Sequence, residues 1–222
     1  MSTIQADFDR IALLAGDEWN HNNHYHDFLL KHVPSPCRET LEIGCGTGSF
    51  SRLLAAHSER VLALDLSPQM IRIARERSGQ FQNIDFQVAD ILSYELPAGR
   101  FDCIATVATL HHLPLEEMLL KMKDALRVDG LLLVLDLFQS ETLADVAMNA
   151  FAVPMRFGLK LIRLGRLRDA REIREAWSEH NRHDSYPTLA QVRHACMETL
   201  PGARIKRHLL WRYSIVWKKI ER

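Results

Sequence analysis

The chain of 222 residues has only four cysteines, and they are scattered along it. None forms the C-x-x-C pair that is typical of zinc ribbons and redox-active thiols. Secreted domains that depend on disulfides carry their cysteines at a much higher density. We therefore expect reduced thiols and a cytoplasmic protein.

Long apolar runs are also missing. No stretch approaches the roughly 18 apolar residues that a membrane-spanning helix needs, and the first ten residues contain no apolar segment of the signal-peptide kind. No internal repeat or low-complexity segment interrupts the chain. We expect a protein without a membrane span, present as a monomer or a homodimer.

The chain lacks a net charge, because 28 Lys and Arg residues balance 28 Asp and Glu residues. Residues 1–155 nevertheless carry a net charge of −9, and residues 156–222 carry +9. The basic residues of the second part are mixed with acids, as at Arg171 and Glu175, and this spacing is typical of an ion-paired, solvated helix face. We expect no nucleic-acid partner, since such a surface needs a clean basic stripe.

Apolar runs of strand length alternate with helical patterns from residue 38 to residue 137. This alternation predicts an α/β fold with a doubly wound, mostly parallel sheet. One predicted helix runs through Met118 and Leu126 and ends at Asp129-Gly130, before an apolar strand at 131–137. Residues 138–186 break the pattern and are expected to form a helical lid after the fifth strand. Residues 203–217 predict two final strands.

A glycine-rich loop, Gly44 to Gly48, lies between the first predicted strand and the helical run that follows. Glycine lets the backbone turn sharply and approach a ligand, with a helix N-terminus pointing at it. Ser49 stands where a dinucleotide fingerprint has its third Gly or Ala, which argues against a pyrophosphate. Glu42, just before the loop, would repel a pyrophosphate and attract an ammonium group.

Acidic and histidine residues follow the later strands. Asp65 ends the second strand 21 residues beyond Gly44, close to the spacing at which an acid binds a ribose diol. Asp90 follows the third strand, and His111 and His112 follow the fourth. Ligands of such sheets lie beyond the strand ends, where the strand order reverses. A ribose and an amine without a pyrophosphate describe S-adenosylmethionine better than NAD.

Four segments together carry a resemblance: residues 41–48, 63–70, 89–90 and 109–113. In this order they resemble the class I S-adenosylmethionine-dependent methyltransferases, especially the small-molecule group that includes ubiquinone- and menaquinone-biosynthesis-like enzymes. The resemblance covers about residues 38–137. It implies a Rossmann-like, seven-stranded sheet whose last strand is antiparallel, in a methyltransferase domain at 38–222.

The resemblance also implies which residues bind the cofactor, S-adenosylmethionine. Glycines of the loop lie against its methionine part, Glu42 near the amino group, Asp65 on the ribose, and Met70 on the adenine. The full implied set is Glu42, Gly44, Cys45, Gly46, Gly48, Asp65, Leu66, Met70, Asp90 and Ile91.

The acceptor of the methyl group is less defined by the sequence. His111 or His112 is the predicted general base, since histidine titrates near pH ~6.5. The Met- and Phe-bearing stretch in 138–186 favours an apolar or aromatic small molecule, with O-, N- and C-methylation all open. Two alternatives remain: a non-catalytic S-adenosylmethionine-binding regulatory protein, and an NAD-dependent reductase.

Residues 1–37 are predicted to form a helical cap. Its Trp19, His21 and Tyr25 are expected to close over the cofactor or the substrate. His21, His24 and His26 have no carboxylate or Cys partner at a recognised ligand spacing, so no metal site is expected.

Overall fold

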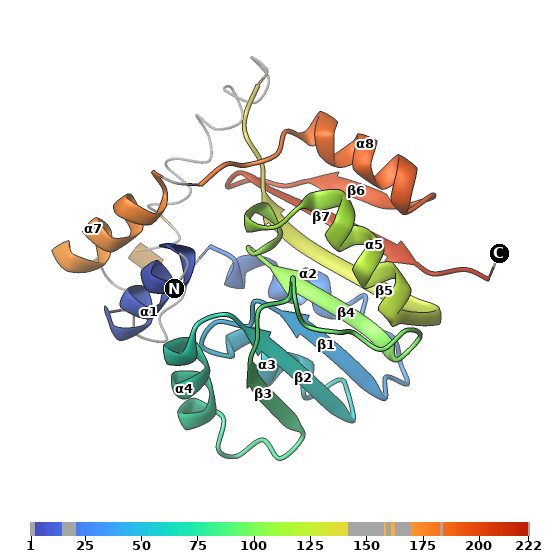
Figure 1. Ribbon diagram of the computed structural model, residues 1–222, viewed down its shortest axis with the longest axis horizontal. Helices are drawn as coiled ribbons and strands as arrows, with labels where there is room; N and C mark the ends of the chain where they lie inside the picture. The colour runs from blue at the N-terminus through green and yellow to red at the C-terminus, as the bar shows by residue number, and fades with distance from the viewer. Residues whose placement is uncertain are drawn as a thin grey trace.

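A twisted sheet with helices on both faces runs through the molecule (Figure 1). The computed structural model describes residues 3–14, 21–141, 158, 161–162, 170–182 and 184–221. The strand order is β3-β2-β1-β4-β5-β7-β6. The strands are β1 (Glu39–Ile43), β2 (Arg60–Asp65), β3 (Ile84–Val88), β4 (Phe101–Val107), β5 (Leu126–Leu137), β6 (Arg204–Arg207) and β7 (Arg212–Lys218).

The helices of the described residues alternate with the strands and extend beyond them at the N-terminus. They are α1 (Thr3–Leu14), α2 (His26–Leu30), α3 (Ser49–Leu54), α4 (Pro68–Arg77), α5 (Leu115–Ala125), α7 (Arg171–His180) and α8 (Leu189–Thr199), with the 3-10 turns η1 (Asn23–Tyr25) and η2 (Leu110–His112). No helix in the described ranges combines the length and the apolar composition that crossing a lipid bilayer requires.

The topology confirms the predicted doubly wound sheet. Strands β1 to β5 are parallel, whereas β7 runs antiparallel to both β5 and β6. The order reverses at β1, where Ile43 lies opposite Leu64 of β2 on one side and Thr106 of β4 on the other. The carboxyl ends of β1 and β4 therefore flank a crevice.

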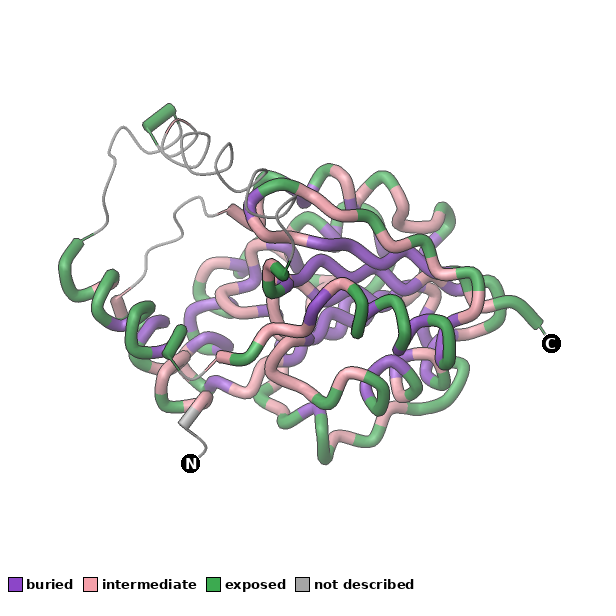
Figure 2. Tube along the Cα trace, turned by 90° about the horizontal axis from the view of Figure 1, so that it is seen from above, coloured by how far each residue is buried: buried purple, intermediate pink, exposed green. Residues whose placement is uncertain are grey.

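Each face of the sheet has its own apolar core. Leu41 and Ile43 belong to the core under α5 and α8, whereas Ala63 and Ala105 belong to the core under α2, α3 and α4. Figure 2 shows the buried segments gathered in the central strands. Strands covered on both faces are buried throughout, which explains their nearly continuous apolar runs. All four cysteines are buried and free, as expected.

A third, smaller apolar cluster joins α1 to α4 and α7. Ile11 and Ala12 of α1 pack there with Met70 and Ile73 of α4 and Ala176 of α7. In both views α1 and α7 lie side by side at one end of the sheet (Figures 1 and 2). Since α4 follows the end of β2, this cluster places both helices beside the crevice.

Local signals in the sequence explain where two helices begin. Ser67 caps α4 by accepting a hydrogen bond from the backbone N–H of Met70, with Pro68 at the first helical position, as predicted. Thr188 and Gln191 form a reciprocal capping box at the start of α8.

The predicted end of α5 at Asp129-Gly130 is wrong. The helix ends at Ala125, and β5 already begins at Leu126, which pairs with Phe101. Asp129 adopts φ +67°, and a Cβ at Gly130 would lie 3.0 Å from the carbonyl oxygen of Phe101. The Asp-Gly pair therefore accommodates an irregularity inside the strand, where the β4–β5 register shifts, instead of ending a helix.

Candidate active site

The glycine loop has the backbone that its sequence predicts. Gly44 has φ +73°, and a Cβ there would lie 2.0 Å from Oγ1 of Thr109, so only glycine fits. Gly46 has φ +53°, and a Cβ there would meet nothing within 4 Å, because the position faces open space. The loop thus turns tightly against β4 while exposing its backbone to a ligand.

Asp65 ties the end of β2 to this loop. Its Oδ2 accepts a hydrogen bond from the backbone N–H of Gly46 at 2.8 Å, and its Oδ1 accepts one from the N–H of Ser67 at 2.9 Å. Burial raises the pKa of Asp65, and these two hydrogen bonds oppose that shift. The acid and the loop therefore form one rigid unit.

Glu42 is a buried acid in the middle of the sheet. Glu42 is only 1% exposed, and its carboxyl group accepts a hydrogen bond from the hydroxyl of Ser51. Burial raises the pKa of Glu42 to about 8, although the Ser51 hydrogen bond and Arg52 oppose the rise. At neutral pH the carboxyl group is therefore largely protonated until a cation approaches it.

A cavity of about 390 Å³ opens above these residues, at the crevice between β1 and β4. Most of the predicted cofactor residues line it, namely Glu42, Gly44, Cys45, Gly46, Asp65, Leu66, Met70, Asp90 and Ile91. Gly48 is not among the lining residues. It caps the start of α3 at φ +77°, with its Cα close to the ring of Phe86.

Two of the three predicted cap residues, His21 and Tyr25, are not among the residues that line the cavity. The hydroxyl of Tyr25 donates a hydrogen bond to the carbonyl oxygen of Leu209 at 2.7 Å, so its ring packs in the core and not over the cavity. Of the described N-terminal segment, Asn22, Asn23 and His26 line the cavity, whereas His21 and Tyr25 do not. Trp19 lies outside the described residues.

Helices α1 and α7 supply the outer wall of the cavity instead. Ile4, Phe8 and Ile11 of α1 line it together with Trp177 of α7. An ion pair joins the two helices at the surface, where Nη1 of Arg10 lies 2.5 Å from Oε2 of Glu179. The outer wall is thus apolar toward the cavity and charged toward solvent.

The two histidines of η2 have different surroundings. His111 is held by Asp136 at the end of β5: Nδ1 lies 2.6 Å from Oδ1, and the backbone N–H donates to Oδ2 at 2.8 Å. His112 lines the cavity, whereas His111 is not among the described residues that do. Of the two predicted bases, only His112 is therefore in position to meet a ligand.

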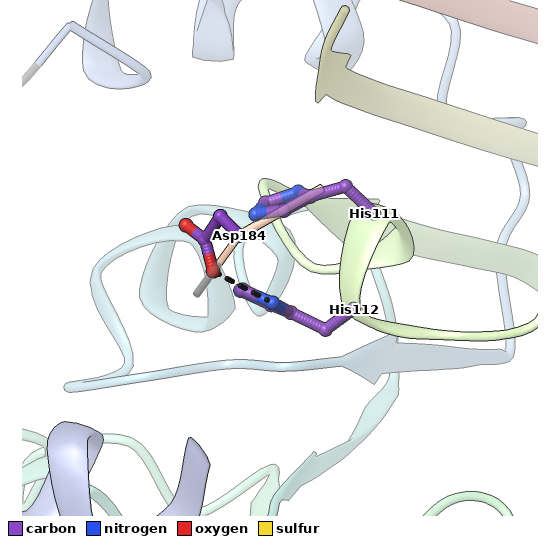
Figure 3. A group of neighbouring side chains, drawn as sticks. All are labelled: His111, His112 and Asp184. Atoms are coloured by element: carbon purple, nitrogen blue, oxygen red, sulfur yellow. Dashed lines mark ion pairs between the residues drawn. The ribbon is translucent and has the colours of Figure 1, made fainter. Parts of the chain in front are cut away.

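A second acid, Asp184, lies behind His112 (Figure 3). Its Oδ1 is 3.5 Å from Nδ1 of His112, while its Oδ2 accepts a hydrogen bond from the hydroxyl of Tyr186 at 2.8 Å. His180 of α7 lies 3.4 Å from the same Oδ2. Burial and the neighbouring His111 lower the pKa of His112 to about 4, so the ring is neutral at pH 7.

Comparison with known proteins places this site in a family. A family model described as a methyltransferase domain matches residues 40–130. A protein of Mycobacterium tuberculosis, named as an uncharacterized methyltransferase, is 31% identical over 207 residues, which cover 90% of this chain and 96% of the relative. The chain belongs to the class I S-adenosylmethionine-dependent methyltransferases.

Other relatives of this methyltransferase agree with that assignment. A ubiquinone biosynthesis O-methyltransferase of Xylella fastidiosa is 37% identical over 91 residues, 40% of this chain and 37% of that enzyme. The structure of the N-methyltransferase NodS from Bradyrhizobium japonicum WM9, solved with S-adenosylhomocysteine, has the same fold. Its TM-score is 0.66 at 20% identity, and the match covers 99% of this chain and 100% of NodS.

The cofactor of this methyltransferase is S-adenosylmethionine, and the chemistry of the cavity wall fits it. A buried acid, Glu42, suits an ammonium group, and a carboxylate at a strand end, Asp65, suits a ribose diol. Met70 and Ile91 add apolar surface for an aromatic base.

Three polar residues of the site escaped the sequence analysis. Asp136 had a signal, because it is the single acid in the otherwise apolar predicted strand at 131–137 and must find a partner when buried. Asp184 and His180 had none, since nothing in the sequence places this segment against the end of β4. Only the folded chain brings them to His112.

Proposed function

We propose that this enzyme transfers the methyl group of S-adenosylmethionine to a small molecule bound in the same cavity. One observation carries the proposal: a single cavity joins the cofactor loop at Gly44–Gly46 to the side chain of His112. Apolar side chains of α1 and α7 line the outer side of this cavity. A cavity of about 390 Å³ suits a small acceptor, whereas a polymer would need a long groove.

The cofactor contacts proposed here are those that the family resemblance implies, and the position of these residues in the cavity wall supports them. Glu42 binds the amino group, Asp65 binds the ribose hydroxyls, and Met70 with Leu66 packs on the adenine. Asp90 and Ile91 hold the adenine edge, since both line the cavity beyond β3. The exposed backbone of Gly46 lies against the methionine part.

The reaction requires little covalent chemistry from the protein. The cofactor supplies an electrophilic sulfonium methyl group, so the chain has to hold the acceptor in line and keep water out. Phe8 and Trp177 perform the second task from the outer wall. His112 contacts the acceptor, and the general-base role predicted for either histidine rests with it, because His111 lies behind.

The acceptor is proposed to be apolar or aromatic in the part that lies against the outer wall formed by α1 and α7. Ile4, Phe8, Ile11 and Trp177 offer apolar and aromatic surface there, and aromatic rings stack well on such surface. The similarity to the Xylella fastidiosa enzyme covers only 91 residues, 40% of this chain, so it does not identify the acceptor.

Calorimetric titration with S-adenosylhomocysteine and with NADH tests the cofactor part. We expect S-adenosylhomocysteine to bind and NADH not to bind. Asp65→Asn should weaken S-adenosylhomocysteine at least tenfold, because it removes a charge-assisted acceptor for the ribose. Asp85→Asn, at an exposed position of β3, is the matched control and should bind like the wild type. Binding of NADH alone would overturn the proposal in favour of a reductase.

A turnover screen tests the reaction. Production of S-adenosylhomocysteine is measured with phenols, quinols, amines and carboxylic acids as acceptors, and mass spectrometry of the product identifies the methylated atom. Turnover with any acceptor, lost in Asp65→Asn and kept in Asp85→Asn, would support the enzyme. Tight cofactor binding without turnover across all four classes would favour the non-catalytic alternative.

A further inference from the structure

Three side chains with metal-binding atoms meet at the edge of the cavity. His111 and His112 extend from η2, and Asp184 reaches them from the segment after α7, as Figure 3 shows. Their nearest ligand atoms all lie within 4.8 Å of one another. The side chains are 4%, 9% and 4% exposed, so they face one another and not bulk water.

Asp136 prepares His111 for such a role. An ionised carboxylate accepts hydrogen bonds, so Nδ1 of His111, 2.6 Å from Asp136, carries the proton, and Nε2 keeps its lone pair. Asp136 also accepts from the backbone N–H groups of His111 and Leu137, which fix its orientation. A carboxylate that orients the distal nitrogen of a histidine is the usual support of a metal-binding imidazole.

The spacing of His112 and Asp184 is unusual for a hydrogen bond. Nδ1 and Oδ1 are 3.5 Å apart, well beyond the preferred distance of about 2.9 Å. Two ligand atoms each about 2.1 Å from a tetrahedral ion lie about 3.4 Å apart. Oδ2 of Asp184 is occupied by the hydroxyl of Tyr186, which leaves Oδ1 directed at the histidines.

Two acids, Asp136 and Asp184, bring negative charge to this cluster. Asp136 is buried, the side chain of Asp184 is 4% exposed, and the ion pairs of both acids within the described residues are with histidines. Buried carboxylates need a compensating positive charge or a full set of hydrogen bonds. A divalent cation between His111, His112 and Asp184 would supply that charge.

We propose that Nε2 of His111, Nδ1 of His112 and Oδ1 of Asp184 bind one divalent first-row transition-metal ion. Two imidazoles and one carboxylate suit zinc, iron, manganese or cobalt, and suit calcium or magnesium poorly. Three protein ligands leave a coordination position open, as in catalytic zinc sites. His112 lines the cavity, so this position lies at the end of the cavity that faces the acceptor.

The metal site stands apart from the methyl-transfer proposal, because it uses none of the cofactor residues. It does change the role of His112: a ring nitrogen that binds a metal has no lone pair left for a proton. With the ion in place, the histidine pair acts by holding the ion beside the acceptor and not as a general base.

The test uses the untagged, full-length chain after removal of metals with a chelator. Cobalt(II) is titrated in, and the visible absorption of the bound ion gives the stoichiometry and affinity; zinc is then added as a competitor. We expect one cobalt per chain and its displacement by zinc. His112→Ala and Asp184→Asn should weaken binding at least tenfold, and Asp136→Asn by 10- to 100-fold, through loss of support for His111.

His57→Ala is the control, since this histidine is exposed and remote from the cluster. It should bind cobalt like the wild type. S-adenosylhomocysteine is titrated into every protein, which shows that each variant is folded and keeps the two proposals separate. The metal site would be overturned if the wild type bound no cobalt, or if His112→Ala and Asp136→Asn bound cobalt as tightly as the wild type. Either result would leave the methyl-transfer proposal intact.

Discussion

The hydroxyl of Ser51 on α3 donates a hydrogen bond to the carboxyl group of Glu42 on β1; both residues are buried, and Glu42 lines the cavity. This contact holds an acid in the most enclosed part of the cofactor site. Burial and the nearby Asp65 raise the pKa of Glu42, while Ser51 and Arg52 lower it, with a net value of about 8.

Glu42 should make the cofactor-free protein less stable as the pH rises. Between its unfolded pKa of 4.5 and its folded pKa of about 8, the native state binds a proton that the unfolded state does not. The free energy of unfolding therefore falls with pH, by up to about 1.4 kcal/mol per unit.

Urea unfolding from pH 6.5 to pH 8 measures this effect. His26, His112 and His208, whose native pKa values are lowered to about 4, bind protons near pH 6.5 only in the unfolded state, so they add a rising contribution that the wild type and the variants share. Relative to the wild type, Glu42→Gln should lose the falling contribution, so its free energy of unfolding should rise more, or fall less, with pH; Glu198→Gln, at an exposed acid of α8, should follow the wild type. An unchanged slope in Glu42→Gln would contradict the prediction.

Cofactor binding should release a proton from the same group. The amino group of S-adenosylhomocysteine stabilises the ionised form of Glu42, so the pKa falls on binding. Calorimetry at pH 7 in two buffers of different ionisation enthalpy should show close to one proton released per ligand. Glu42→Gln should release none. If this variant released as many protons as the wild type, the proton would come from another group.

Gly44→Ala should damage both the fold and the cofactor site. The substitution places a methyl group against the side chain of Thr109 and forces a left-handed backbone on alanine. We expect a loss of about 2–5 kcal/mol in unfolding free energy, from backbone strain and overpacking together. Binding of S-adenosylhomocysteine should weaken at least tenfold.

Gly79→Ala is the matched control for this substitution. A Cβ at Gly79 meets nothing within 4 Å, and its φ is not left-handed, so stability should change by no more than about 0.5 kcal/mol. Thermal or urea unfolding of the two variants compares them directly. Equal losses would show that the contact with Thr109 does not decide the residue at position 44.

Trp177 should report on ligand binding from the outer wall. It lines the cavity from α7 and is 41% exposed, so a ligand beneath it changes its surroundings. Addition of S-adenosylhomocysteine should change the tryptophan fluorescence of the wild type, and Trp177→Phe should lose most of that change. Trp211→Phe, away from the cavity, should keep it. A full fluorescence change in Trp177→Phe would show that Trp177 does not cover the ligand.

The cofactor half of the site could be predicted from the sequence because local chemistry specifies it. Gly44 requires a left-handed backbone, and Asp65 lies at the end of an apolar run, so each position carries its own signal. The doubly wound, mostly parallel sheet followed from the alternation of strands and helices. Such features depend on residues near one another in the chain.

The outer wall and the second acid could not be predicted in this way. Phe8 and Asp184 reach His112 only through packing of α1 against α7, and no local pattern encodes that contact. Tyr25 was expected over the cavity because its polar surroundings suggested a mobile cap. Its hydroxyl instead found a carbonyl acceptor in the loop before β7.

The hydrogen bond from Tyr25 to Leu209 spans 184 positions, and the one from Arg212 to Asn22 spans 190. The segment that brings Asn22, Asn23 and His26 to the cavity is thus seated on the loop leading into the last strand. During synthesis the first residues of the chain emerge long before that seat exists. The strands β1 to β5 can pair as they emerge, but the wall of the cavity on this side is completed only when β7 has left the ribosome, so the binding site is among the last parts of the molecule to mature.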